Sequence, residues 1–331
     1  MKKLTILLFS LIIFSSCNNN TSNNDYIRIN REDFKEVKLH GEIMNLDTIW
    51  NPLSIHLKDS LLFIINRSGD YFVQTFNLNN NNFLTYNVPS GLGPNESVQC
   101  NFIFVTDDYV MAAEPHFRLI RKYKYDDFVT TIGCLPIEEI QFDQTITSFI
   151  QNNNGNLITS LYSNNDTMLC EFDTKLTSNI KYAPYPNVLY PEFSLEHNWS
   201  NYLHSTISYN SHRDKIVIAY SINDMIDIYN SDLTLYKRII GPMNLPHKGD
   251  IERDTYPCCA STSDYIMALY SGKPIEADEE YSNEIFVFDY EGNPIKIFNL
   301  DTQIFNFCID ENKKCIYAVT PEFSVVKFKY E

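Results

Sequence analysis

The sequence predicts an all-β fold, a six-bladed β-propeller whose last blade is closed by the N-terminal strand. The final stretch, Phe305–Tyr330, reads as three short strands separated by two polar turns. Its apolar middle strand is typical of a small antiparallel sheet that is covered on both faces. Comparable units occur six times along the chain, about 50 residues apart, a period typical of propellers. No apolar helical period extends beyond a turn or two.

Each predicted unit contains three or four strands. The middle strands begin at Leu61, Tyr109, Leu157, Lys215, Tyr265 and Cys315. The units themselves span Pro52–Val88, Asn101–Ile132, Thr147–Tyr182, Thr206–Ile239, Cys258–Asn299 and Phe305–Tyr330. Fourth strands are expected at Phe83–Val88 in the first unit and at Phe128–Ile132 in the second. A β-sandwich is the main structural alternative, but it does not explain a regular period over the whole chain.

The two ends of the chain predict how the ring closes. Unit six has only three strands before Glu331, and a strand candidate around Phe34–Leu39 precedes unit one. A ring of blades leaves no open sheet edge only if the last blade is completed by the first segment. We therefore expect the N-terminal strand to pair as the outer strand of the C-terminal blade.

The first residues have the pattern of a secretory signal. Lys2 and Lys3 precede the apolar run Leu4–Phe14, and Ser15 and Ser16 precede Cys17. The pattern resembles a bacterial lipoprotein signal, in which Cys17 becomes the acylated N-terminus. An ordinary signal peptide with a chance cysteine is the alternative, and Phe14 departs from the residue usual there. The predicted division is a signal peptide over 1–16, a lipidated polar tether over 17–25 and the propeller over 26–331.

The predicted anchor implies a membrane as a partner. Acyl chains insert with about 0.8 kcal/mol per buried CH₂ group, so several chains hold a soluble domain firmly. The Asn-rich tether lacks the acidic run that resembles a surface-export signal in some lipoproteins. We therefore expect an outer membrane lipoprotein of the cell envelope that faces the periplasm.

Composition limits the other partners. Without Lys2 and Lys3 the chain has 24 basic and 42 acidic residues, a net charge of −18. Such a surface repels phosphates, so nucleic acid is not an expected partner. The seven cysteines after Cys17 show no C-x-x-C and no zinc spacing. Cys308 and Cys315 flank one hairpin and are candidates to face each other; most of the seven are expected as small buried strand residues.

Long irregular segments interrupt the period. Ala183–Leu203 has three prolines and five aromatic residues, and Met243–Pro257 separates units four and five. Segments of this length in a compact domain are usually functional or disordered, and the aromatic content argues against disorder. We expect both to be loops over one face of the ring. A third segment, Ser271–Asn283, is acidic and lies within unit five.

The segment between units one and two carries the sharpest motif. Gly91–Glu96 reads GLGPNE, and with the six units and the lipoprotein start it resembles the TolB-like six-bladed β-propeller lipoproteins. That family often has G-x-G-P-x-E between its first two blades. The resemblance covers nearly all of the mature chain and implies fold and location rather than chemistry. From the residues alone, the motif is a turn in which glycines allow positive φ and Pro94 fixes the exit.

The expected site is the mouth of the central channel. The first strand of each blade should face the axis, and its first positions are uncharged: Asn51, Gln99, Thr147, Ser205, Cys258 and Asn306. Six-bladed lactonase-type enzymes instead place Glu, Asp and Asn there to hold a metal. We therefore expect no metal, no cofactor and no catalytic residue. The binding candidates are His56, Glu96, Gln99, Glu114, His116, Arg118 and Asn306.

Two functions remain open from the sequence. The first is a non-catalytic, lipid-anchored module that binds a ligand, or an envelope protein or glycan partner, on the loop face. Aromatic loop residues favour such contacts. The alternative is a hydrolase or lactonase with its site at the channel mouth. Carboxylates converging on one point would favour the enzyme, and a neutral channel with an aromatic rim would favour the binding module.

Overall fold

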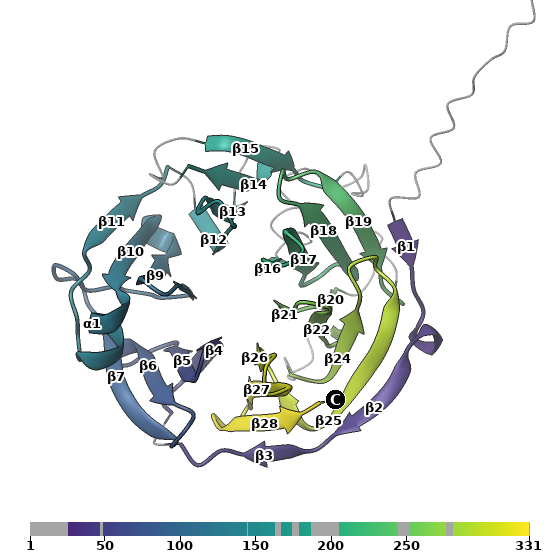
Figure 1. The fold of residues 1–331 in the computed structure, drawn as a ribbon, viewed down its shortest axis with the longest axis horizontal. Coiled ribbons are helices and arrows are strands. Elements are labelled where there is room, and N and C mark those ends of the chain that lie inside the picture. The colour runs from purple at the N-terminus through teal and green to yellow at the C-terminus, as the bar shows by residue number, and fades with distance from the viewer. Residues whose placement is uncertain are drawn as a thin grey trace, which may run out of the picture.

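Four-stranded antiparallel sheets are arranged as six blades around one axis, which Figure 1 views end-on. The structure is a computed structural model that describes residues 26–46, 49–143, 145–162, 167–173, 179–186, 205–243, 252–275 and 281–330. In every blade the first strand lies innermost and the fourth lies near the rim. The predicted six-bladed propeller is thus confirmed.

The first three blades follow one another along the chain. Blade 1 consists of β4 (Pro52–Lys58), β5 (Leu61–Asn66), β6 (Tyr71–Asn77) and β7 (Asn82–Pro89). Blade 2 consists of β8 (Phe102–Val105), β9 (Tyr109–Glu114), β10 (Leu119–Lys124) and β11 (Glu138–Gln141). Blade 3 consists of β12 (Thr145–Gln151), β13 (Leu157–Tyr162), β14 (Thr167–Phe172) and β15 (Asn179–Pro184).

The N-terminal segment adds one strand to each of the last three blades, whose main strands are as follows. Blade 4 consists of β16 (Ser205–Asn210), β17 (Lys215–Tyr220), β18 (Met225–Asn230) and β19 (Leu235–Ile240). Blade 5 consists of β21 (Cys258–Ser261), β22 (Ile266–Tyr270), β24 (Ser282–Phe288) and β25 (Pro294–Ile304). Blade 6 consists of β26 (Asn306–Asp310), β27 (Cys315–Val319), β28 (Val325–Lys329) and β3 (Gly41–Ile43).

The N-terminal segment wraps around three blades before the ring begins. β1 (Tyr26–Arg28) pairs in parallel with β19, and β2 (Lys35–Leu39) pairs in parallel with β25. β3 then pairs antiparallel with β28 and completes blade 6, as predicted. The strand that closes the ring is therefore β3, whereas the candidate segment Phe34–Leu39 reinforces blade 5. Gly41 permits the closure, because a Cβ there would lie 2.5 Å from a methyl group of Val326.

The outer strand of the second blade is not the segment that the sequence predicted. The segment expected as a strand, Phe128–Ile132, lies largely in the short helix α1 (Tyr125–Thr130), and β11 supplies the fourth strand instead. Asp126 and Asp127 lie in the first helical turn, where carboxylates are favoured by the helix dipole. Phe128 is fully buried against Phe63 and Tyr123, so the helix fills the seam between blades 1 and 2.

The hydrophobic core lies at the seams between blades rather than at the axis. The described residues form six buried clusters, one for each pair of neighbouring blades. The second strands are apolar on both faces because each packs against two neighbours. The runs 62–65 and 216–219, in the second strands of blades 1 and 4, are fully buried. This packing explains the continuous apolar middle strands in the sequence.

In the described part of the chain, two blades contain an ion pair in which both side chains are largely buried. In blade 4 the fully buried Asp227 accepts hydrogen bonds from Arg238 at 2.7 and 2.8 Å and from Tyr220 at 3.0 Å. In blade 2 Glu114 accepts from Arg121 at 2.6 Å. Buried charges require such partners, since an isolated one costs several kcal/mol. The alternation of the strands gave no sign of either pair.

The cysteines after Cys17 are all free thiols. Cys308 lies opposite Tyr317 and Cys315 lies opposite Asp310, so the two cysteines of this hairpin do not face each other. Five of the seven are buried, as the sequence predicts for small strand residues.

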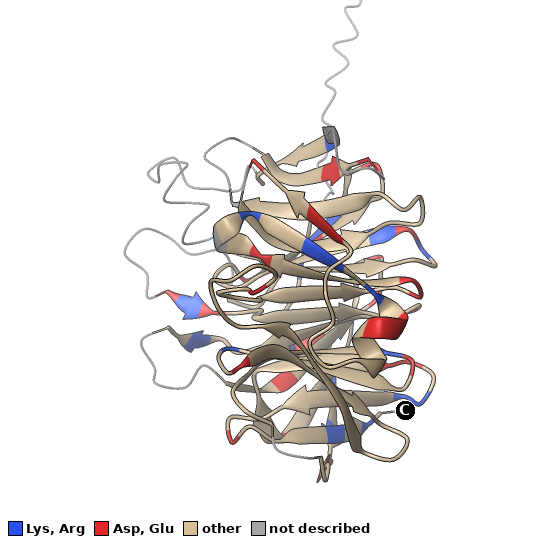
Figure 2. Ribbon diagram, turned by 90° about the vertical axis from the view of Figure 1, so that its left-hand side faces the viewer, with Lys and Arg blue, Asp and Glu red and all other residues tan. Residues whose placement is uncertain are grey.

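The ring has two different faces, which Figure 2 shows from the side. The hairpin face carries the turns between first and second strands, at 59–60, 106–108, 152–156, 211–214, 262–265 and 311–314. The mouth face carries the starts of the first strands and all connections between blades. β20 (Arg253–Asp254) and β23 (Lys273–Pro274) form a small sheet there, at the left of Figure 2.

The described residues that flank the segments expected as loops lie at the mouth face. Most of Ala183–Leu203 and of Met243–Pro257, and part of Ser271–Asn283, lie outside the described residues. Their described neighbours are the ends of β15, β19 and β22 and the starts of β16, β21 and β24, which all lie at this face. No helix in the described ranges has the length and apolar character needed to cross a membrane.

Candidate functional site

A cavity of about 810 Å³ runs along the axis of the ring and is lined by the first strands of all six blades. A first strand pairs on only one side, with the second strand of its own blade. Its other edge faces the axis and presents unpaired backbone groups. The volume lies within the range of about 300–1,000 Å³ that is usual for small-molecule sites.

Four of the six predicted channel positions line the cavity. These are Thr147, Ser205, Cys258 and Asn306, whereas Asn51 and Gln99 do not line it. In blade 2 the lining begins at Asn101, two residues after the expected position. Asn306 also links the ends of the ring, because its side-chain oxygen accepts a hydrogen bond from Ile55 N at 3.1 Å.

His56 is the one histidine in the lining formed by described residues. An imidazole nitrogen lies 3.3 Å from Ser54 Oγ, and the ring meets Phe102 edge-on with centroids 5.3 Å apart. Burial lowers the pKa of His56 to about 4, since no carboxylate compensates the lost hydration. The imidazole is therefore neutral at neutral pH.

Charged lining residues lie only at the mouth in the described structure. They are the exposed Arg67, which follows β5, and Asp254 of β20. Neither residue was among the candidates predicted from the sequence, because neither lies in a motif or at the start of a first strand. Among the described residues no group of three or more His, Cys, Asp or Glu side chains is arranged to hold a metal.

Glu96 does not line the channel but folds back into its own loop. Its carboxylate accepts a hydrogen bond from Gly93 N at 2.7 Å. A Cβ at Gly91 or Gly93 would lie 2.0 or 2.9 Å from this carboxylate. Gly91 also has a φ of +155°. The spacing of G-x-G-P-x-E thus reflects two glycines that leave room for the glutamate.

The other blade 2 candidates also lie outside the channel lining. Glu114 is buried in the ion pair with Arg121, and its second oxygen accepts from Val98 N at 2.8 Å. Arg118 has a φ of +53° and donates to the backbone oxygen of Asp143 at 2.7 Å. The side chain of His116 lies outside the described residues. These contacts hold the loops around blade 2 in place.

Hydroxyl and thiol groups line the seam between blades 4 and 5. Thr206 Oγ1 donates to Cys259 Sγ at 3.3 Å, and the Ser208 and Ser261 hydroxyls lie 2.7 Å apart. Burial raises the pKa of Cys258 to about 12 and also raises that of Cys259. Both thiols are therefore protonated at neutral pH and are poor nucleophiles.

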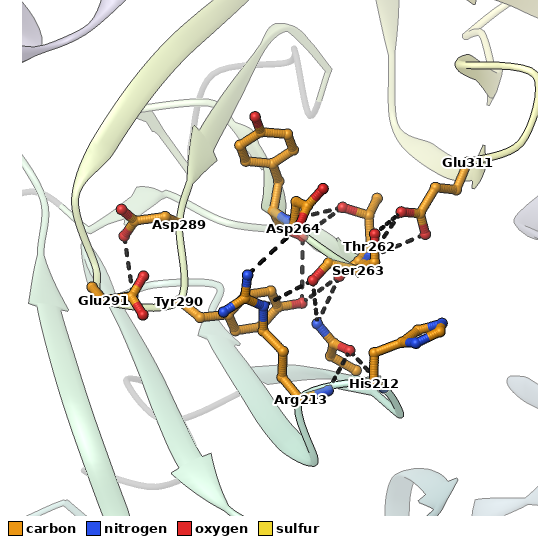
Figure 3. Close-up of polar contacts among 11 residues, drawn as sticks. His212, Arg213, Thr262, Ser263, Asp264, Asp289, Tyr290, Glu291 and Glu311 are labelled. Atoms are coloured by element: carbon orange, nitrogen blue, oxygen red, sulfur yellow. Dashed lines mark hydrogen bonds and ion pairs between the residues drawn. The ribbon is translucent and has the colours of Figure 1, made fainter.

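A second polar cluster lies on the hairpin face and joins blades 4, 5 and 6 (Figure 3). Arg213 Nε donates to the backbone oxygen of Ser263 at 2.9 Å, and its guanidinium lies 3.5 Å from Asp264. Ser263 N in turn donates to both carboxylate oxygens of Glu311, at 3.1 and 3.0 Å. Because its polar groups bind one another across blades, this cluster fastens neighbouring hairpins.

Comparisons with solved structures agree with the fold. A protein of Bacteroides fragilis described as exported has a TM-score of 0.61 at 13% identity, covering 92% of this chain and 98% of its own. The Neurospora crassa Pan2 WD40 domain has a TM-score of 0.54 at 10% identity, with coverage of 88% and 94%. These low identities show the fold alone.

The sequence comparison identifies the family. No curated protein matches this sequence. The family model described as TolB-like 6-blade propeller-like matches residues 33–312, which include strands from every blade. The chain therefore belongs to the TolB-like six-bladed propeller family.

Proposed function

We propose that this chain is a non-catalytic binding module of the cell envelope that takes a small ligand into its central channel. The observation that carries the proposal is the cavity of about 810 Å³, whose interior lining in the described structure is uncharged. Such a cavity offers contact surface and hydrogen-bonding groups, which is what a binding site needs. The neutral His56 and the protonated thiols offer no activated nucleophile.

The location is part of the proposal. Residues 1–16 direct export, Cys17 carries the acyl chains, and residues 17–25 tether the propeller to the outer membrane on its periplasmic side. The signal-like run before Cys17 supports this arrangement. The similar Bacteroides fragilis protein, which is described as exported, is consistent with it.

Metabolic labelling with a palmitate analogue tests the anchor. The full-length protein should take up the label and fractionate with outer membranes, and Cys17→Ser should lose both. Cys134→Ser, which removes a buried thiol of the mature part, is the matched control and should keep the label. Label that persists in Cys17→Ser would reject the acylated anchor.

Incubation of the purified protein with a panel of lactones and esters tests the absence of catalysis. The proposal predicts no turnover above a heat-denatured sample. Turnover that is lost in a channel variant such as His56→Gln would instead support the alternative, a hydrolase or lactonase.

A further inference from the structure

We propose that the channel binds an uncharged ligand of about one or two sugar rings, with hydroxyl groups on its edge and an apolar face. This inference rests on the proposed ligand-binding function and assigns the chemical class of the ligand. It follows from how the lining residues are distributed around the axis.

Phenylalanine rings and most of the hydroxyl side chains occupy opposite halves of the channel. All four phenylalanines of the described lining belong to blades 2 and 6: Phe102, Phe104, Phe305 and Phe307. Eight of its nine hydroxyl side chains come from blades 3 to 5: Thr147, Ser148, Ser205, Thr206, Ser208, Tyr209, Ser221 and Ser261. The ninth is Ser54 of blade 1.

The arrangement of the ring places these two halves face to face. In a six-membered ring the seam of blades 1 and 2 lies across the axis from the seam of blades 4 and 5 (Figure 1). At the seam of blades 1 and 2 the rings of His56 and Phe102 are in contact, and at the seam of blades 4 and 5 the hydroxyls of Ser208 and Ser261 are in contact. A ligand between them meets an aromatic surface on one side and hydroxyl groups on the other.

Because the interior lining in the described structure carries no charged side chain, we expect the ligand to be uncharged. His56 is neutral, and the charged groups Arg67 and Asp254 lie at the mouth. A charged group carried past the mouth would lose its hydration without gaining an ion pair, which is strongly unfavourable. Neutral hydroxyl groups can both donate and accept, so they match the hydroxyls of the lining.

Polar groups along the channel argue against a purely apolar ligand. The hydroxyl side chains of blades 3 to 5 line the cavity, as do the free edges of the first strands. An apolar ligand would displace water from these groups without replacing its hydrogen bonds. A sugar ring can bond to them along its edge while its C–H face packs on an aromatic ring.

Calorimetry on the full acylated protein in detergent micelles tests the class of ligand. The probes are the neutral disaccharides cellobiose, maltose and chitobiose, the charged analogues lactobionate and the chitosan dimer, and the neutral apolar dye Nile red. We expect at least one neutral disaccharide to bind and the charged analogues to bind at least tenfold more weakly.

A paired set of variants locates the binding. Ser208→Ala combined with Ser261→Ala removes two channel hydroxyls without adding volume and should weaken disaccharide binding by about tenfold or more. The matched control Ser211→Ala lies in a turn of the hairpin face, where the backbone oxygen rather than the hydroxyl accepts a hydrogen bond from Asn153. It should bind as the wild type does, and equal melting temperatures will show that all variants are folded.

The outcomes separate the class of ligand from the proposed function. Preferred binding of a charged analogue or of Nile red, weakened by a channel variant such as Phe102→Ala, overturns the class and keeps the channel as a binding site. Disaccharide binding that is unchanged in the double variant overturns the assigned site. If no probe binds, both the class and the small-ligand function are overturned.

Discussion

The hairpin face and the mouth face of this ring are built by the same strands but differ in how their polar groups are paired. On the hairpin face, turns of two to five residues bring neighbouring blades together. Contacts between successive turns include Lys58 with Asp107 at 2.7 Å, Asn153 with Ser211 at 2.8 Å and Ser263 with Glu311. These charged and polar groups bind each other.

The mouth face instead carries groups that the fold does not fully satisfy. Arg67 is exposed there, and Asp224, in the turn before β18, is 1% exposed. Met243 N donates to Asp224 Oδ2 at 2.6 Å, and the hydroxyl groups of Tyr256 and Tyr270 lie near this carboxyl. Oδ1 nevertheless has no hydrogen bond of ordinary geometry among the described residues. The comparison shows that one face of the propeller fastens neighbouring blades through paired groups, while the other keeps a buried carboxyl oxygen without a hydrogen-bond partner among the described residues.

The largest expected effect is at Asp224. Burial raises the pKa of this carboxyl to about 6, above its value near 3.8 in the unfolded chain. The folded state therefore holds the proton more tightly, and stability is lost as the pH rises from about 4 through 6. Asp224→Asn stays neutral and can still accept from Met243 N. It should exceed the wild type by up to about 3 kcal/mol at pH 8.

Urea denaturation at pH 4 and pH 8 checks this prediction. The advantage of Asp224→Asn should be present at pH 8 and absent at pH 4. Glu322→Gln, an exposed residue of the turn before β28, is the control for a loss of negative charge. A wild type that is the more stable protein at pH 8 would contradict the account of the mouth face.

His56, inside the channel, should show the opposite pH dependence. Its folded pKa of about 4 lies below the ordinary value of 6.5, so the folded state binds the proton less well than the unfolded state. The contribution of the neutral imidazole to the free energy of unfolding is therefore fully present above pH 6.5 and is lost as the pH falls towards 4. We expect a loss of about 2 kcal/mol, because the ring is partly exposed to the channel.

The same denaturation series on His56→Gln sharpens the contrast. The variant should lack the decline between pH 6.5 and pH 4 that is assigned to His56. A variant whose decline equals that of the wild type would show that the imidazole is solvated and that the channel is wetter than proposed.

A smaller effect is expected on the hairpin face, at Glu311. Glu311→Gln keeps one oxygen but loses the charge that accepts both hydrogen bonds from Ser263 N. The free energy of unfolding should fall by about 1 kcal/mol. Glu322→Gln, in an exposed turn of the same blade, is the matched control and should have no effect. Equal stabilities of the two variants would mean that the cluster in Figure 3 does not fasten the blades.

The smallest effect belongs to Lys58. Its partner Asp107 has a side chain that is 87% exposed, so the ion pair is hydrated and screened. Lys58→Ala should lower the melting temperature less than Glu311→Gln does, and its effect should vanish in about 1 M salt. If Lys58→Ala lowered the melting temperature more than Glu311→Gln does, the predicted ranking of these two contacts would be wrong.

The sequence predicted what depends on pattern. The continuous apolar strands at Leu61 and Lys215 are buried between two blades, so they repeat wherever a blade repeats. The closing strand was placed a few residues early, because β2 and β3 both alternate and only pairing with β28 distinguishes them. α1 was missed because Phe128 packs into a seam that no local pattern shows.

The site was harder to predict than the fold. Thr147, Ser205, Cys258 and Asn306 could be assigned to the channel because they lie at or near the starts of first strands. The separation of Phe102 from Ser208 and Ser261 depends on which blades face each other across the axis. Glu96 looked like a channel residue because nothing in its spacing shows that the carboxylate folds onto Gly93.

Hydrogen–deuterium exchange with and without a bound neutral disaccharide tests the central claim most directly. The account predicts slower exchange in the first strands, above all in β8, β16 and β21, and unchanged exchange in the turns of the hairpin face. Protection confined to the outer strands or to the hairpin turns would contradict binding in the channel.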